Sequence, residues 1–235
     1  MSLEFTAYRN NDWPKGRRVA GIAAIVFAIL QLVVFPAVAP DVLPVLGASP
    51  ASVVSYFASH KMAFLIGNYL GVLGVVPGLV TLSYLTALFR RREGEDGWLW
   101  LLVFGSGLFA FGVATTALIV LQAIPFLSAP GLEVGAKAIS DLGEVAFALM
   151  MVGVLAFALS VAWATLVTRA LPRWVATWGF VTAGVAFVAS LGSIWTPPVL
   201  AGGGPVTSLA LVVWVCWFGA ISWPLLRGTR VTRGT

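Results

Sequence analysis

Charged residues are scarce in this sequence, and their scarcity excludes an ordinary soluble domain. Only 10% of the 235 residues are charged and 60% are hydrophobic, whereas a soluble domain usually carries about 25% charged residues. A domain of this length can bury a sizeable core, but lipid must shield a surface this apolar. We therefore expect an integral membrane protein.

Histidine and cysteine are nearly absent, which removes several kinds of chemistry. One histidine, His60, and one cysteine, Cys216, allow neither an intramolecular disulfide nor a zinc site of the His/Cys type. There is also no Gly-rich phosphate loop, no H-E-x-x-H pair and no G-x-S-x-G elbow. We expect no catalytic constellation, no metal and no cofactor. Cys216 is expected to be a small buried hydrophobic residue in the last span.

The sequence instead contains long stretches without a charged residue. A helix needs about 20 apolar residues to cross a hydrocarbon core of about 30 Å, and the apolar runs lack the period-2 alternation of a β-barrel. The sequence predicts an all-α fold, one membrane domain over residues 1–235 containing a bundle of six transmembrane helices. The expected spans are 19–39, 62–89, 97–124, 145–168, 174–195 and 205–226.

The basic residues predict how the chain lies in the membrane. Twelve of the 14 lysines and arginines fall on one side of the predicted spans, and only Lys61 and Lys137 fall on the other. The positive-inside rule makes the rich side, with both termini, cytoplasmic. No basic cluster is interleaved with aromatic residues on a soluble face, so we expect no nucleic-acid partner. Eleven arginines against three lysines in an Ala/Val/Gly-rich chain indicate a bacterial cytoplasmic membrane.

The first outer loop is the longest connection and is expected to contain a short helix. Ser49-Pro50 is typical of an N-cap followed by proline at the first helical position. Two further outer segments are expected at 128–144 and 196–205. Ala37-Val38-Ala39 resembles a signal-peptidase site, but Pro40 follows it and the apolar run is longer than about 7–15 residues. We expect an uncleaved first span.

Glycines in the second span give the clearest packing pattern. Gly67, Gly71, Gly74 and Gly78 share one helical face, which permits close approach of another helix or of a flat ligand. Helix–helix packing is the commoner use of such a face. Pro77 lies within the stripe and predicts a kink.

Polar residues near the outer ends of spans 2 and 4 form the one candidate ligand site. Counting about 20 residues outward from Phe89 and Thr168 leaves Asn68 at the interface and Glu144 about one turn beyond the core. His60, Asn68, Asp141 and Glu144 then define a hypothetical outer vestibule that binds a cation or moves a proton. The other interpretation is that Asp141 and Glu144 stabilise the N-terminus of span 4 through its dipole.

Three local features resemble a six-span bacterial membrane family. They are the opening Arg18-Val19-Ala20-Gly21, the long loop before span 2, and the turn Leu171-Pro172-Arg173-Trp174 before a span containing Gly179 and Gly184. The chain resembles the family called domain of unknown function 4386. The resemblance implies the six-span architecture and implies no activity, substrate or catalytic residue.

Three functional hypotheses remain open. The favoured one is a non-enzymatic protein that binds a lipid or apolar ligand or supports a membrane-protein partner, with a homo-oligomer permitted. The alternative is a small proton- or cation-linked transporter or channel with the outer vestibule. An intramembrane enzyme acting on lipid is the third, and the sequence offers no paired acid and nucleophile for it.

Overall fold

A computed structural model describes residues 13–38, 48–94, 97–127, 129, 131–195, 200 and 204–227 of the chain. These residues form helices and turns without a strand, and six of the helical segments are long and apolar enough to cross a membrane. The all-α, six-span prediction is confirmed. Ala39, Pro40 and most of the predicted outer turn at 196–205 lie outside the described residues, as do Arg9, Arg230 and Arg233.

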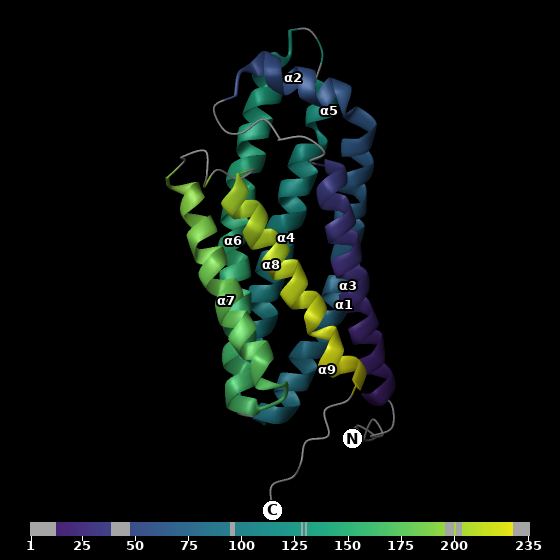
Figure 1. Ribbon diagram of the computed structural model, residues 1–235, viewed down its shortest axis with the longest axis vertical. Helices are drawn as coiled ribbons and strands as arrows, with labels where there is room; N and C mark the ends of the chain where they lie inside the picture. The colour runs from purple at the N-terminus through teal and green to yellow at the C-terminus, as the bar shows by residue number, and fades with distance from the viewer. Residues whose placement is uncertain are drawn as a thin grey trace, which may run out of the picture.

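Each predicted span corresponds to a helix or to a pair of consecutive helices (Figure 1). In chain order the elements are α1 (Trp13–Val38), α2 (Pro50–Ser59), α3 (Lys61–Glu93), α4 (Leu99–Gln122), α5 (Ile124–Leu127), α6 (Glu133–Thr168), α7 (Arg173–Ser190), the 3-10 turn η1 (Leu191–Ser193), α8 (Pro205–Ala220) and α9 (Ser222–Arg227). Short breaks divide the third span at Ala123 and the sixth at Ile221.

The six spans pack in a closed ring. Each span contacts the next one along the chain, in the order α1, α3, α4, α6, α7, α8, and α8 with α9 returns to α1. Short connections favour such antiparallel neighbours. The start of α1 and the end of α9 lie at the same end of the bundle (Figure 1).

Aromatic side chains fill the space between helices that are not neighbours in sequence. Phe27 on α1 lies 5.7 Å from Phe111 on α4 and 4.8 Å from Phe218 on α8, measured between ring centroids. Trp214 lies 5.6 Å from Phe27 in an edge-on arrangement. Aromatic pairs of this kind contribute about 0.5–1.5 kcal/mol each beyond their buried area. The cluster therefore fixes α8 against α1 and α4.

The short helix predicted in the loop after the first span is present as α2. Ser49 is the N-cap of α2, and its hydroxyl oxygen accepts a hydrogen bond from the Ser52 amide at 3.2 Å, with Pro50 at the first helical position. Val53 and Phe57 are buried. They pack in a cluster with residues of α3, α4, α5 and α6, so α2 closes one end of the bundle. We call this end, which also contains α5, the capped end.

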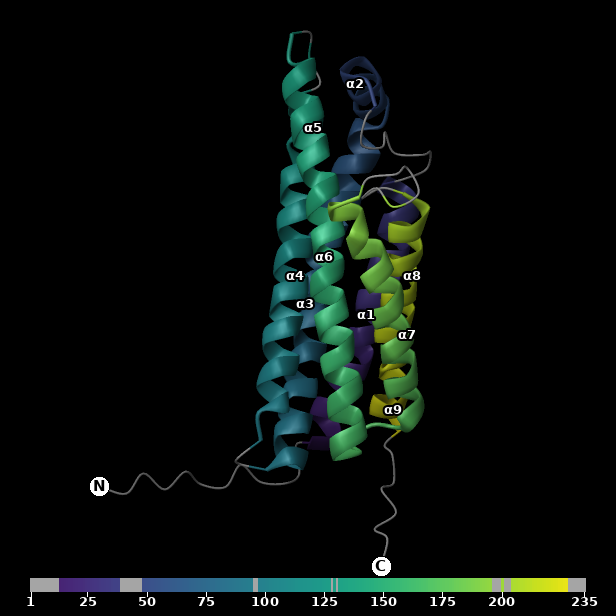
Figure 2. The same cartoon turned by 90° about the vertical axis from the view of Figure 1, so that its left-hand side faces the viewer.

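The helix α6 begins twelve residues before the predicted span, so the prediction of an outer loop at 128–144 is wrong for residues 133–144. One face of this early part, with Ala136, Ser140 and Gly143, is buried, and Ala136 packs in the cluster beneath α2. The 36 residues of α6 span about 54 Å at 1.5 Å each, which is longer than the hydrocarbon core. In Figure 2 its upper end extends beyond those of α7 and α8.

The predicted burial of Cys216 is wrong. Its side chain is exposed on α8, whereas Trp214, Trp217 and Phe218 on the same helix are buried. These larger side chains occupy the inward face of α8.

Two glycines of α4 and one of α7 make no close contact with a neighbouring helix. A Cβ atom added at Gly105, Gly112 or Gly184 would have no heavy atom of a neighbouring helix within 4 Å. These three glycines therefore mark no close approach between helices.

The glycine stripe on α3 is buried at all four positions, Gly67, Gly71, Gly74 and Gly78. A Cβ atom at Gly74 would lie 2.6 Å from the Gln31 side-chain nitrogen on α1, and one at Gly78 would lie 2.7 Å from the Phe111 ring on α4. The stripe therefore runs beneath side chains of both neighbouring helices. The helix α3 continues through Pro77 to Glu93.

Candidate functional site

His60 lies at the junction of α2 and α3, where it is both the C-cap of one helix and the N-cap of the next. Its Nδ1 atom is 2.9 Å from the Tyr56 carbonyl oxygen and 3.0 Å from the Ser59 hydroxyl. The imidazole stacks on the Tyr56 ring at 4.6 Å between centroids. These contacts tie the His60 ring to its own helix junction.

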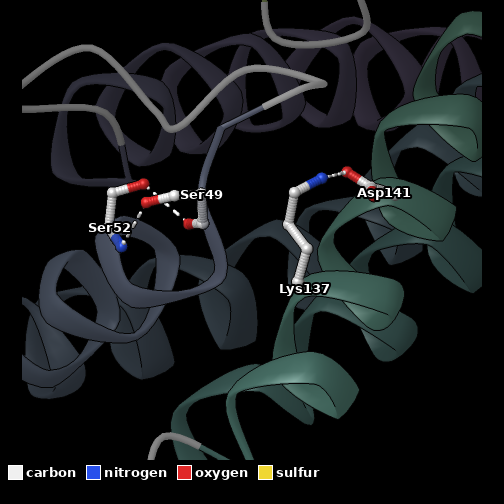
Figure 3. Close-up of polar contacts among 4 residues, drawn as sticks. All are labelled: Ser49, Ser52, Lys137 and Asp141. Atoms are coloured by element: carbon white, nitrogen blue, oxygen red, sulfur yellow. Dashed lines mark hydrogen bonds and ion pairs between the residues drawn. The ribbon is translucent and has the colours of Figure 1, made fainter.

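Asp141 forms an ion pair with Lys137 one turn away on α6 (Figure 3). The carboxylate is thus balanced by a cation of the same helix. The other two residues drawn in the figure, Ser49 and Ser52, form the α2 cap and bond to each other.

Glu144 is buried, with 8% of its surface exposed. Because α6 begins at Glu133, Asp141 and Glu144 lie in its third and fourth turns. The helix-dipole effect is confined to about the first turn, so the dipole interpretation of these two residues is wrong. Within the described part of the chain, no three histidine, cysteine or acidic side chains lie close enough to hold a metal ion.

A groove of about 390 Å³ lies between α3 and the α4–α5 segment at the capped end. Small-molecule sites in proteins usually have volumes of about 300–1,000 Å³. Of the four predicted site residues, only Asn68 lines the groove. The lining comprises Asn68, Tyr69, Val72, Leu118, Ile119, Gln122, Ala123 and Phe126.

Two amide side chains are the groove's main polar groups, and both leave an acceptor unused. Asn68 is 1% exposed, and its Nδ2 donates a long hydrogen bond of 3.4 Å to the Leu118 carbonyl oxygen. The Asn68 Oδ1 and Gln122 Oε1 atoms are buried and accept no hydrogen bond from any described residue. A buried acceptor left unsatisfied costs about 1–3 kcal/mol. Both oxygens are enclosed by protein atoms, so the surface of the groove itself is almost entirely apolar.

The groove lies at the depth of a membrane boundary. Twenty residues counted from Phe89 on α3, at about 1.5 Å each, reach Tyr69, and twenty from Leu99 on α4 reach Ile119. Two helices running in opposite directions thus place the edge of the hydrocarbon core at residues that both line the groove. Asn68 and Gln122 then lie at the interface, with Val72 on the hydrocarbon side.

The side chains around the mouth of the groove suit contact with lipid. Tyr69, Ile119 and Phe126 are 60–65% exposed, so the groove is accessible from the outside of the bundle. The Lys61 ammonium lies over the Phe126 ring, 5.4 Å from its centroid. Lys61 is the first residue of α3, seven positions beyond Asn68, and therefore about 10 Å farther from the core.

Sequence reasoning missed Lys61, Gln122 and Phe126 as parts of a site. A glutamine within a span is more often an interhelical hydrogen-bonding group than a ligand contact. In the sequence alone, Lys61 indicates only on which side of the membrane its loop lies. The available signal was depth: counting about 20 residues from Phe89 on α3 and from Leu99 on α4 puts Asn68 and Gln122 near the same level.

No family model, curated protein or solved structure matches this chain. The resemblance to domain of unknown function 4386 therefore stays a prediction. What the structure establishes is the class, a polytopic membrane protein with six candidate membrane-spanning helices.

Proposed function

We propose that this protein is a non-enzymatic membrane protein that binds a lipid or another apolar ligand in the groove between α3 and α4. The observation that carries the proposal is an apolar groove at the membrane boundary that opens to the outside of the bundle between the exposed side chains of Tyr69, Ile119 and Phe126. An apolar lining with a few convergent polar groups is typical of a ligand site. A role in supporting a membrane-protein partner is compatible with such a ligand.

The proposed setting is a bacterial cytoplasmic membrane, with the capped end outside. Arg90, Arg91 and Arg92 end α3, and Arg169, Arg173 and Arg227 are at the same end as the start of α1 by the alternation of the spans. An excess of arginine and lysine marks the cytoplasmic side. The groove then faces the outer leaflet.

The absence of an enzymatic role is part of the proposal and is supported by the groove's chemistry. Amide side chains are neither acids nor nucleophiles at neutral pH, and tyrosine is the remaining polar side chain in the lining. A reaction at this site would lack the acid and nucleophile pair that acyl or phosphoryl transfer requires. Binding and orientation are what these residues supply.

The test is native mass spectrometry of the protein extracted gently from its host membrane, followed by identification of what stays bound. We expect one lipid or apolar molecule per chain, lost when Ile119→Trp fills the groove. Ile22→Trp is the matched control, because Ile22 on α1 is similarly exposed at 55% and lies outside the groove. A bare chain, or equal retention by both variants, would contradict the proposal; a second polypeptide in the spectrum would identify a partner or a homo-oligomer.

A second candidate function, a proton- or cation-linked transporter, is favoured by the burial of one carboxyl group. Glu144 is buried near the capped end, and ionisable groups in membrane bundles often serve ion pathways. The test is flux into proteoliposomes. Transport that is abolished by Glu144→Gln and retained by Asp141→Asn would favour this function over lipid binding.

A further inference from the structure

The groove between α3 and the α4–α5 segment extends through the membrane boundary. On α3 its lining reaches inward to Val72, three residues to the hydrocarbon side of Tyr69. On the other wall its lining reaches outward to Phe126, seven residues beyond Ile119, or about 10 Å at 1.5 Å for each residue. Because Tyr69 and Ile119 mark the edge of the hydrocarbon core, one end of the groove lies beside acyl chains and the other lies among lipid headgroups.

A positive charge borders the headgroup end of the groove. The Lys61 ammonium lies over the Phe126 ring, 5.4 Å from the ring centroid, and Phe126 forms part of the groove wall. Lys61 is exposed, and its stem is long and flexible, so the ammonium can reach a group that lies in the outer end of the groove.

The charge of Lys61 has no counter-ion within the protein. Among the residues that the structure describes, no carboxylate forms an ion pair with Lys61. Lys137, the other lysine at the capped end, is paired with Asp141 on α6. The cation beside the groove is therefore available to a ligand, whereas the charge of Lys137 is already balanced.

The two ends of the groove define an amphiphile of one charge type. The walls around Val72, Leu118 and Ile119 are apolar and suit an acyl chain. Lysine binds phosphate as a point charge. A zwitterionic headgroup brings a cation of its own, which Lys61 repels, whereas an anionic headgroup brings none.

We infer that the groove binds a glycerophospholipid with a net negative headgroup in preference to a zwitterionic lipid with the same acyl chains. One acyl chain lies along Val72 and Ile119, and the phosphate lies toward Lys61. The lipid enters sideways from the bilayer, because Tyr69, Ile119 and Phe126 leave the groove open to the outside of the bundle. This inference rests on the proposed function, and it adds the charge class of the headgroup.

The experiment is a lipid competition followed by native mass spectrometry, using the full chain after its host lipids have been exchanged away. The probes are phosphatidylglycerol, which is anionic, and phosphatidylcholine, which is zwitterionic, with identical acyl chains and in equal amounts. We expect phosphatidylglycerol to be retained about 5-fold more than phosphatidylcholine, the effect of one lysine near an anionic headgroup.

Three variants test the role of Lys61. Lys61→Gln is expected to reduce the ratio of the two retained lipids to about 1, because it removes the charge that distinguishes them. Lys61→Arg keeps the charge and is expected to keep the preference. Lys137→Gln is the matched control: it also removes one positive charge at the capped end, but that charge is paired with Asp141, so the preference should remain.

The outcomes separate this inference from the proposed function. Equal retention of the two lipids, with both lost in Ile119→Trp, would overturn the headgroup inference and leave lipid binding in the groove intact. A preference that survives Lys61→Gln, or that falls equally in Lys137→Gln, would also overturn the inference, because the selecting charge would then lie elsewhere. A preference that survives Ile119→Trp would place the bound lipid outside the groove. Retention of neither probe and of no host lipid would overturn both proposals.

Discussion

Gly153 on α6 lies directly against the backbone of Ala110 on α4. A Cβ atom at Gly153 would lie 2.7 Å from the Ala110 Cα atom and 3.0 Å from its amide nitrogen. Both residues are buried. Small residues let membrane helices approach this closely, and van der Waals packing then replaces the hydrophobic driving force that lipid removes.

Gly153→Ala is predicted to destabilise the bundle. The atoms in the way belong to the backbone, which cannot rotate aside, so α4 and α6 must separate along their contact. Overpacking of this kind costs about 1–3 kcal/mol. The measurement is the free energy of unfolding in mixed micelles.

Gly112→Ala is the control for that prediction, since a Cβ there meets no heavy atom within 4 Å. We expect it to be neutral or slightly stabilising, because alanine favours a helix over glycine by about 1 kcal/mol. Equal destabilisation by both variants would show that the loss comes from the glycine itself and not from the α4–α6 contact.

These glycines show what spacing in the sequence does and does not predict. The four-glycine stripe of α3 is visible as a pattern, and its members are indeed buried. The close approach at Gly153 leaves no repeat in the sequence of α6, because the residue that it packs against, Ala110, is on another helix. Gly105 and Gly112 have regular spacing but no neighbour within 4 Å. Periodicity identifies a face, whereas the neighbour of that face depends on how the helices are arranged.

Glu93 at the end of α3 caps the beginning of α4. Its carboxylate oxygens accept hydrogen bonds from the amides of Trp98 at 2.9 Å, Leu99 at 3.0 Å and Trp100 at 3.3 Å. The first amides of a helix have no partner within it, and a negative charge there is stabilised by the helix dipole. Glu93 therefore fixes the turn between two spans.

Glu93→Ala is predicted to cost about 0.5–2 kcal/mol, the usual range for loss of a helix cap. Glu93→Gln keeps an oxygen acceptor and removes only the charge, so its cost should be about 0.3–1 kcal/mol. The measurement is again the free energy of unfolding in mixed micelles. If the glutamine variant were as unstable as the alanine variant, charge and not hydrogen bonding would dominate the cap.

Trp217 forms a hydrogen bond that joins two neighbouring spans. Its indole nitrogen donates to the Val175 carbonyl oxygen at 3.0 Å, and both groups are buried. Trp217→Phe is predicted to destabilise the protein by about 1 kcal/mol, the net value of a typical hydrogen bond. Trp178→Phe is the control, because Trp178 on α7 is 53% exposed; a similar loss there would point to ring size and not to the hydrogen bond. The readout is the thermal unfolding midpoint, followed by tryptophan fluorescence.

The fold could be predicted from the sequence more fully than the site. Hydropathy identifies the six spans because lipid makes every membrane helix satisfy its own backbone, and the Ser49 cap with Pro50 identifies α2. The part of α6 at the capped end was missed because its residues 133–144 are polar enough to resemble a loop, although packing beneath α2 stabilises them as a helix. Charge led the site prediction to Asp141 and Glu144, whereas the groove is lined by uncharged residues such as Asn68 and Gln122. Their significance comes from their shared depth on neighbouring helices, which only an arrangement of helices reveals.

The orientation of the chain gives a prediction that cysteine labelling tests. Cys216 is the single cysteine, and Cys216→Ala should leave stability nearly unchanged because the side chain is exposed on α8. In that background, Ala51→Cys on α2 and Arg92→Cys at the end of α3 place thiols at opposite ends of the bundle, both at exposed positions. The concentration of arginine at the α3 end predicts that Ala51→Cys reacts with a membrane-impermeant maleimide in intact cells, and that Arg92→Cys reacts only after the membrane is opened. The opposite pattern would place the groove in the cytoplasmic leaflet, where Lys61 would meet the anionic lipids of that face, and the positive-inside rule would fail for this protein.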